Sequence, residues 1–286
     1  MKWPELILGA LLLDAPLCAA AQEGSYPADP LQEFKAQMIQ ALKKELNDAS
    51  PQIPALLSSE TVKTNDPSIR QALTDLLETE KTASGEHKAA ILLAADLLAE
   101  KLWCDHANSP ECLQLRDQMA VYKLSWKYSE LGGGWYYYHD LLWRLWNEYG
   151  STRWGEMAFV LLLNHGWDTS GVCHKGSDQF REVIRQGGAF VAARPASPYR
   201  ADVQFEVAEA NRTWWSLSQA SADDEYVNAT KYREGAAAAR ATAIRDYDEV
   251  IKAAPGTQIA REAQGQIKDL QSDSKPEQGP FYCIYD

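Results

Sequence analysis

The densest chemistry in the sequence is aromatic. Residues 135–146 read WYYYHDLLWRLW, and further tryptophans follow. Aromatic faces offer a large contact area at a small entropic cost, so this segment could stack on a sugar chain or hold an extended peptide. The candidate binding residues are Trp135, Tyr136, Tyr137, Trp143, Trp146, Trp167 and Asp168.

The alternative for each of these aromatic residues is packing between helices. Tyr138, Leu142 and Leu145 recur at helical spacing and fit a buried face. The neighbouring aromatic residues must then divide between core and surface. The sequence leaves both interpretations open.

Histidine, cysteine and aspartate offer a second kind of chemistry. Cys173 and His174 are the residue types of a nucleophile and its base, but adjacent residues usually point apart, and no protease signature surrounds Cys173. His139 beside Asp140 meets the same objection. The sequence contains no P-loop, dinucleotide fingerprint, G-x-S-x-G or H-E-x-x-H motif. We therefore predict no catalytic residue, no enzyme activity and no cofactor.

The cysteines that follow residue 21 are even in number. In an exported chain they predict two disulfides, for which three pairings exist. We favour one bond that closes a short loop between two helical segments and one that ties the C-terminal tail to an internal loop. These pairs are Cys104 with Cys112 and Cys173 with Cys283.

A metal site is the alternative use of these cysteines. Its ligands would be Cys104, His106 and Cys112, or Cys173 with His174. Neither set has the paired C-x-x-C spacing of a zinc site, so we predict no metal.

The composition is that of a globular protein. It is 45% hydrophobic and 24% charged, which argues against disorder. The formal net charge of -12 disfavours nucleic acid and anionic membrane surfaces as partners.

Residues 1–21 have the features of an export signal. Lys2 gives a positive start, residues 6–13 form an apolar run too short to span a bilayer, and residues 19–21 offer a small-residue cleavage site. The residues before Cys18 do not fit a lipobox, so we do not expect a lipoprotein. We expect a periplasmic or secreted protein that is not membrane-spanning once the signal is removed.

Almost every periodic segment has the spacing of a helix. No run of alternating β-branched residues is apparent, so we predict an all-α fold without strands. The expected helices are 31–48, one that starts at Asp66-Pro67, 86–103, 109–130, 135–149, 152–165, 178–194, 198–219, 229–254 and 257–271.

Three of the expected joints between helices share a pattern. A helix breaker is followed two residues later by a hydroxyl that can cap the next helix, then by a bulky residue and a small or branched one on a common face. The first set is Gly150, Thr152, Trp154 and Ala158. The second is Pro195, Ser197, Tyr199 and Val203, and the third is Pro255, Thr257, Ile259 and Ala263.

The segment ATAIRDYDEVIKAAP resembles the second helix of a tetratricopeptide repeat. Ala243, Tyr247, Val250 and Pro255 match its small, aromatic, apolar and proline positions in spacing. With the three joints, the pattern is similar to divergent repeats of bacterial envelope proteins such as outer-membrane assembly lipoproteins. The resemblance implies a helix-turn-helix solenoid.

The repeat interpretation divides the chain into units. Helices pair as 112–149, 152–194 and 198–254, with 257–271 as a closing helix, and the extra length falls in the loops within each unit. The expected domains are a signal at 1–21, a helical segment at 22–110, tetratricopeptide-like repeats at 111–271 and a tail at 272–286. We predict a non-catalytic scaffold that binds an envelope protein or peptide, the alternative being an envelope enzyme or a glycan-binding module.

Overall fold

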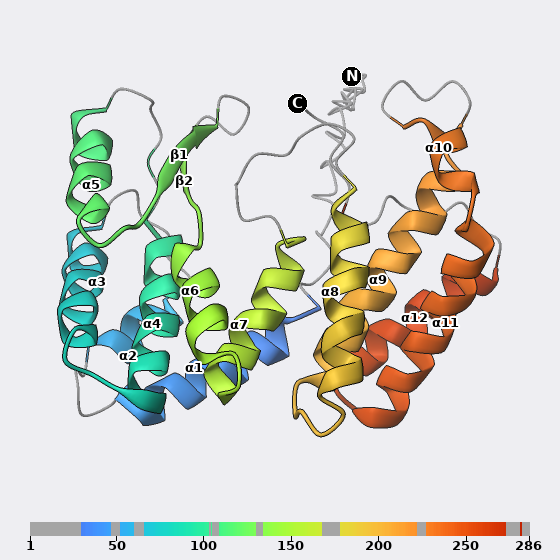
Figure 1. Ribbon diagram of the computed structural model, residues 1–286, viewed down its shortest axis with the longest axis horizontal. Helices are drawn as coiled ribbons and strands as arrows, with labels where there is room; N and C mark the ends of the chain where they lie inside the picture. The colour runs from blue at the N-terminus through green and yellow to red at the C-terminus, as the bar shows by residue number, and fades with distance from the viewer. Residues whose placement is uncertain are drawn as a thin grey trace, which may run out of the picture.

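The computed structural model describes residues 30–46, 52–59, 66–102, 104, 109–129, 134–167, 178–221, 227–272 and 281. Twelve helices and one two-stranded sheet make up this part of the chain (Figure 1). The predicted all-α class is confirmed. The export signal, Asp168, Cys173 and Cys283 lie outside the described residues.

Helix α4, Gly85–Glu100, is the apolar centre of the first part of the chain. Its residues are buried on almost every side, and α1, α2 and α3 pack against it. The start of α3 follows the sequence closely, because the Asp66 carboxylate accepts a 2.8 Å hydrogen bond from the Ser68 amide and Pro67 opens the helix. The bounds are α1 Gln32–Leu46, α2 Ile53–Ser58, α3 Pro67–Glu80, α4 Gly85–Glu100 and α5 Pro110–Ala120.

Cys104 and Cys112 form a disulfide, as predicted. Their Cα atoms lie 5.7 Å apart, and the bond links the segment after α4 to the first turn of α5. Both residues are buried. The bond therefore holds α5 close to the end of the central helix.

Two of the predicted helices are wrong in part, because the structure forms a hairpin between them. The predicted helices 109–130 and 135–149 give way to β1 Trp126–Ser129 and β2 Gly134–Tyr137, which pair antiparallel with Trp126 opposite Tyr137. The rings of this pair lie 4.9 Å apart between centroids, and both residues are buried at 5% exposure. Aromatic packing across the pair, not an alternation of β-branched residues, therefore stabilises the hairpin.

The remaining helices form the second half of the chain. The expected helix 229–254 is broken, because Gly235 adopts a φ of 81° and a Cβ there would lie 2.7 Å from the Trp214 ring. The bounds are α6 Asp140–Tyr149, α7 Arg153–Asn164, α8 Gln179–Ala193, α9 Arg200–Ser218, α10 Ala229–Arg233, α11 Ala236–Ala253 and α12 Gln258–Gln271.

The three breakers all lie in turns between consecutive helices. Gly150 joins α6 to α7, Pro195 joins α8 to α9, and Pro255 joins α11 to α12. In each turn the backbone amide of the Ser or Thr donates a hydrogen bond to the carbonyl oxygen three residues earlier. The distances are 2.8 Å at Thr152, 3.1 Å at Ser197 and 3.3 Å at Thr257. The hydroxyls of Thr152 and Thr257 then cap the next helix. The Ser197 hydroxyl instead accepts a 3.1 Å hydrogen bond from the Tyr199 amide, before α9 begins, so the expected cap is present in two of the three turns.

The buried positions after each turn also follow the pattern, with one exception. The small or branched residues, Ala158, Val203 and Ala263, are all fully buried. Of the bulky residues, Trp154 and Ile259 are buried, whereas Tyr199 is only half-buried. The pairing of helices differs from the expected units, because α8 packs most extensively on α9. Its contacts with α7 are fewer and include Phe190, which stacks on Phe159 with ring centroids 4.5 Å apart.

Helix α1 joins the two halves of the molecule. Figure 1 shows it running along the lower side of α4 and α7. It contacts α2 and α4, which are early in the chain, and Gln258 at the start of α12. The amides of Glu33 and Gln258 bond reciprocally to each other's side chains, at 3.1 and 2.7 Å. At the other end of α1, Glu45 forms a 2.9 Å ion pair with Arg153. In the described part of the chain, no helix is both long and apolar enough to cross a membrane.

We predict opposite effects for alanine at two adjacent glycines of α8. A Cβ at Gly187 would lie 2.4 Å from Val207 Cγ2, so Gly187→Ala should lower the free energy of unfolding by about 1–3 kcal/mol. Gly188 is exposed with nothing within 4 Å of such a Cβ, so Gly188→Ala should raise it by about 0.5–1 kcal/mol. Urea unfolding measures both. Equal effects at the two positions would contradict the close packing of α8 on α9.

Candidate functional site

A polar cavity of about 300 Å³ lies where α1, α2, α4, α6 and α7 meet. Most of the surrounding core is apolar, so the charged and titratable groups that line the cavity stand out. These groups are Lys35, Asp96, Glu100, Lys101, His139 and His165.

Asp96 and His139 form the buried centre of the site. Asp96 is fully buried, in the middle of the apolar helix α4, and its Oδ2 lies 2.9 Å from His139 Nδ1. Burial of an unpaired carboxylate costs several kcal/mol, and a hydrogen-bonded imidazole offsets this cost. With Nδ1 bonded to the carboxylate, Nε2 of His139 is the nitrogen left to bind a ligand.

The second oxygen of Asp96 is not paired. Oδ1 is buried and has no hydrogen-bond partner among the described residues. Such atoms are rare in proteins and often mark a site with a further ligand or function. The carboxylate therefore has more hydrogen-bonding capacity than the surrounding core uses.

The backbone of His139 is in a conformation that favours glycine. Its φ of 52° and ψ of 36° are left-handed, directly before α6. Two contacts hold this turn: the Tyr138 amide donates to the Ser125 carbonyl at 3.0 Å, and the Ser125 amide donates to the Asp140 carboxylate at 2.6 Å. Strained residues of this kind persist where the surroundings impose them and are common at functional sites.

His165 lies beside His139 at the end of α7. The two imidazole rings are 4.2 Å apart between centroids. Burial, together with the nearby charges of His139 and Lys35, lowers the pKa of His165 from 6.5 to about 3. Burial would also lower the pKa of His139, but the Asp96 carboxylate raises it above its ordinary value. His165 is therefore a neutral imidazole at neutral pH, the form that binds metal ions.

Glu100 completes a set of possible metal ligands. One side-chain atom each from Glu100, His139 and His165 lies within 4.8 Å of the others. Bonds of about 2.0–2.1 Å to a tetrahedral Zn²⁺ would require ligand atoms roughly 3.4 Å apart. Glu100 is exposed at the last turn of α4, so its side chain has room to turn inward. Two imidazoles and a carboxylate are a common donor set for a metal ion with open positions.

The sequence did not predict this site. Its metal hypotheses concerned cysteines, and it considered His139 only beside Asp140, while Asp96, Glu100 and His165 had no part in any predicted site. A useful signal was present, because Asp96 is the one charge in the middle of an apolar helix. Spacing along the chain cannot show that His139 and His165 meet.

The candidate aromatic residues belong largely to the packing of α6, α7 and the hairpin. Tyr137 is buried between the rings of Trp126 and His139, so its ring has no free face for a ligand. Its phenol oxygen accepts a 3.1 Å hydrogen bond from the Leu141 amide. Trp135 and Tyr136 are half-buried on β2, where Arg116 lies 5.6 Å from the Trp135 ring. Tyr138, expected in the core, is also only half-buried.

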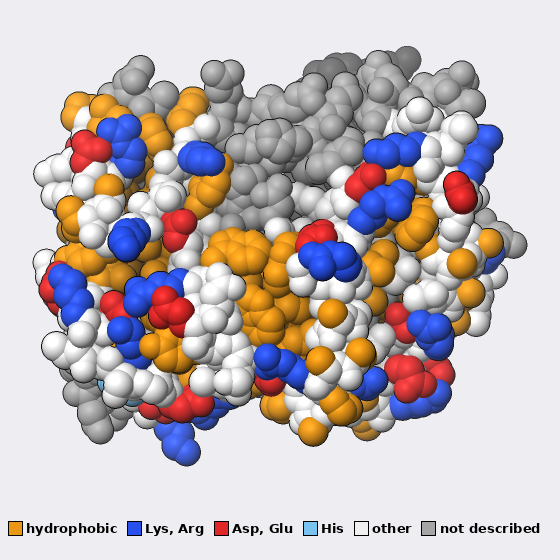
Figure 2. Space-filling view, in the orientation of Figure 1, with side chains coloured by type: hydrophobic (Ala, Val, Ile, Leu, Met, Phe, Trp, Pro, Cys, Tyr) orange, Lys and Arg blue, Asp and Glu red, His pale blue; other side chains and the backbone are white. Residues whose placement is uncertain are grey.

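The other candidate tryptophans bridge helices. Trp143 and Trp167 meet edge to face, with centroids 5.0 Å apart. The ring centroid of Trp146 lies 4.5 Å from that of Phe159 and 6.3 Å from that of Phe190. Figure 2 shows hydrophobic side chains gathered over α7 between α6 and α8. These tryptophans are half-buried, so each packs against the core and keeps part of its side chain exposed.

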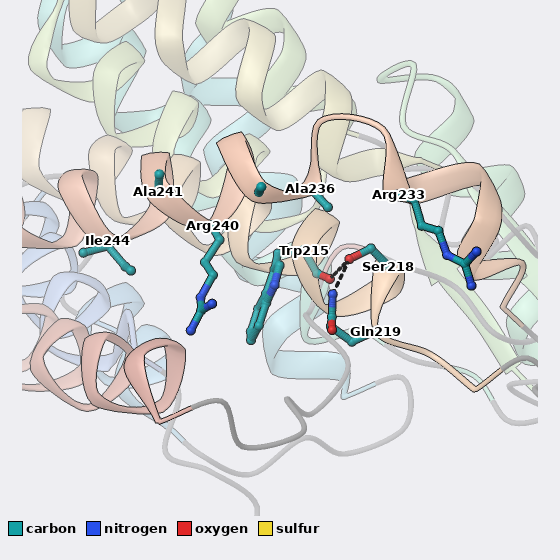
Figure 3. Close-up of a pocket in the computed structure, with 9 residues that line it drawn as sticks. Trp215, Ser218, Gln219, Arg233, Ala236, Arg240, Ala241 and Ile244 are labelled. Atoms are coloured by element: carbon teal, nitrogen blue, oxygen red, sulfur yellow. Dashed lines mark hydrogen bonds between the residues drawn. The ribbon is translucent and has the colours of Figure 1, made fainter.

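A second cavity, of about 700 Å³, lies along α9 and α11 (Figure 3). Arg240 stacks 5.0 Å from the Trp215 ring and donates a 2.8 Å hydrogen bond to the Leu270 carbonyl. Of the described residues that line this groove, only Arg233 and Arg240 are charged, and none is a histidine, cysteine or carboxylate. These residues therefore offer no set of metal ligands comparable to that of the histidine cavity.

No family model, curated protein or solved structure matches the chain. The function of the histidine cavity is therefore argued from its own geometry and charge.

We predict that His165 makes the metal-free protein sensitive to acid. Because its folded pKa is depressed, its contribution to stability is complete above pH 6.5 and is lost as the pH falls toward about 3. His165→Gln should therefore lose less stability than the wild type between pH 7 and pH 4.5, with a difference that grows by up to about 1.4 kcal/mol per pH unit. Urea unfolding at several pH values measures this.

The control is His87→Gln, which removes a histidine that is 43% exposed and lies outside the cavity. It leaves His165 in place and should therefore keep the acid sensitivity that His165 contributes. If His165→Gln loses as much stability as the wild type between pH 7 and pH 4.5, His165 is not held neutral by burial.

Proposed function

We propose that this protein binds a divalent transition-metal ion, Zn²⁺ by preference, through Glu100, His139 and His165. The observation that carries the proposal is the 2.9 Å bond from His139 Nδ1 to Asp96, which leaves Nε2 as the ring nitrogen for a metal ion, beside ligand atoms of Glu100 and His165 within 4.8 Å. A histidine that binds a metal usually donates its other ring nitrogen to a carboxylate in this way.

The chemistry of the donors favours zinc over other ions. Imidazole nitrogen and carboxylate oxygen suit Zn²⁺, whereas Ca²⁺ and Mg²⁺ prefer oxygen ligands alone. Three protein ligands leave a fourth position open. That position would face the cavity of about 300 Å³, which is large enough for a water molecule or a small ligand.

We expect metal-stripped protein to bind one equivalent of Zn²⁺ in isothermal titration calorimetry. His139→Ala and His165→Ala should abolish saturable binding at the site, since each removes a ligand. Asp96→Asn should weaken binding by about 10- to 100-fold, because it disturbs the orientation of His139 without removing a ligand. Co²⁺, bound in place of Zn²⁺, should give the visible absorption of a four-coordinate site.

The matched control is His87→Ala, which removes an exposed histidine at the start of α4, at the opposite end of the helix from Glu100. Circular dichroism checks that each variant folds. Zinc binding that survives loss of both His139 and His165 would refute the proposal.

The three equivalent turns favour a second candidate function. They are the features expected of a helical-repeat scaffold, and they support our proposal that the exported protein binds a protein or peptide of the cell envelope. Metal binding and partner binding are compatible, because the groove along α9 and α11 is separate from the histidine cavity.

Site-specific crosslinking in the native host tests the scaffold function. A photoreactive residue at Ala237, exposed in the groove, should capture one envelope protein. The same residue at Lys44, exposed on α1, should not. Identical products from both positions, or none from Ala237, would count against a partner at this face.

A further inference from the structure

The disulfide lies close in the chain to one of the proposed metal ligands. Glu100 is the last residue of α4, and four residues later Cys104 is bonded to Cys112 in the first turn of α5. A second ligand, His139, comes shortly after β2 of the hairpin. The chain that leaves α4 and the hairpin therefore each carry one ligand.

Two hydrogen bonds join the hairpin to the residues that follow α4. The Trp135 amide of β2 donates to the Cys104 carbonyl at 2.9 Å, and these two residues form an antiparallel β-bridge. The Trp126 indole of β1 donates to the Leu102 carbonyl at 3.3 Å, in the buried core. Both strands are thus attached to the chain between Glu100 and the disulfide.

The disulfide secures this attachment to α5. Its Cα atoms lie 5.7 Å apart, and Cys104 and Cys112 are buried at 1% and 4% exposure. Without the bond, only non-covalent contacts would hold Cys104 against the hairpin. The chain after α4 would then have to be ordered when a metal binds, and this ordering lowers affinity.

We propose that the oxidation state of Cys104 and Cys112 controls the metal affinity of the site, because their disulfide holds Glu100 and His139 in register through the hairpin. The inference rests on the proposed metal site. Formation of the Sγ–Sγ bond removes two electrons and two protons from the two thiols, and a disulfide oxidant takes them up and becomes a dithiol. Such bonds form and persist in oxidising compartments, so the protein would reach full metal affinity there.

The test compares zinc binding by the wild type and by the double variant Cys104→Ser/Cys112→Ser in isothermal titration calorimetry. Serine is close to cysteine in size, but it cannot form the bond and supplies no thiolate that could itself bind zinc. Zinc affinity should fall about tenfold, the lower limit of the loss seen when the surroundings of a metal ligand are disturbed.

Trp126→Phe tests the same path with the disulfide intact. It keeps an aromatic ring opposite Tyr137 but removes the donor to the Leu102 carbonyl. Zinc binding should therefore weaken in this variant too. Circular dichroism checks that both variants fold.

The matched control is Gly187→Ala, which we expect to destabilise the fold at the contact between α8 and α9. It touches neither the disulfide nor the hairpin and should keep the wild-type zinc affinity. An equal loss in this control would overturn the inference, since a general loss of stability would then explain the effect.

The outcomes separate the two proposals. Oxidised wild-type protein that binds no zinc overturns both. A folded serine variant with the wild-type zinc affinity overturns this inference alone. If the serine variant does not fold, Trp126→Phe decides, and unchanged zinc affinity in that variant overturns the inference.

Discussion

The hydrogen bond between Asp96 and His139 is the constraint on which the histidine cavity depends. A carboxylate in the middle of an apolar helix must find a partner, and removal of one member of a buried pair typically costs about 3–5 kcal/mol. To supply that partner, the chain turns His139 into the core through a left-handed backbone conformation. The hairpin before α6 and the Ser125 contacts to Tyr138 and Asp140 hold this turn in place.

The cavity also depends on elements that are distant in sequence. Helix α4 supplies the carboxylates, α6 and α7 each supply a histidine near one end, and α1 covers them with Lys35. The joint at Gly150 connects the two histidine-bearing helices and fixes their relative position. Repeat-like packing and site chemistry are therefore linked, because a turn that recurs for structural reasons also sets how α6 and α7 meet.

Local chemistry explains what the sequence could predict. Thr152 and Thr257 cap helices as their types and positions suggested, and Cys104 pairs with Cys112 across a short loop. The hairpin was missed because its strands have only four residues each and do not alternate strictly between buried and exposed positions. The site was missed for a different reason: Asp96 and His139 are 43 residues apart, and only tertiary packing brings them together.

The position of α1 bears on the order in which the chain can assemble. Glu33 and Gln258 bond to each other across 225 residues of sequence, so the first described helix reaches its final contacts only after most of the chain has been synthesised. Closure of so long a loop is entropically costly and tends to slow folding. The contacts of α1 with α2 and α4 can form well before its bond to Gln258, which waits for α12. The first described helix is therefore secured in two stages, the second of which joins the two ends of the folded chain.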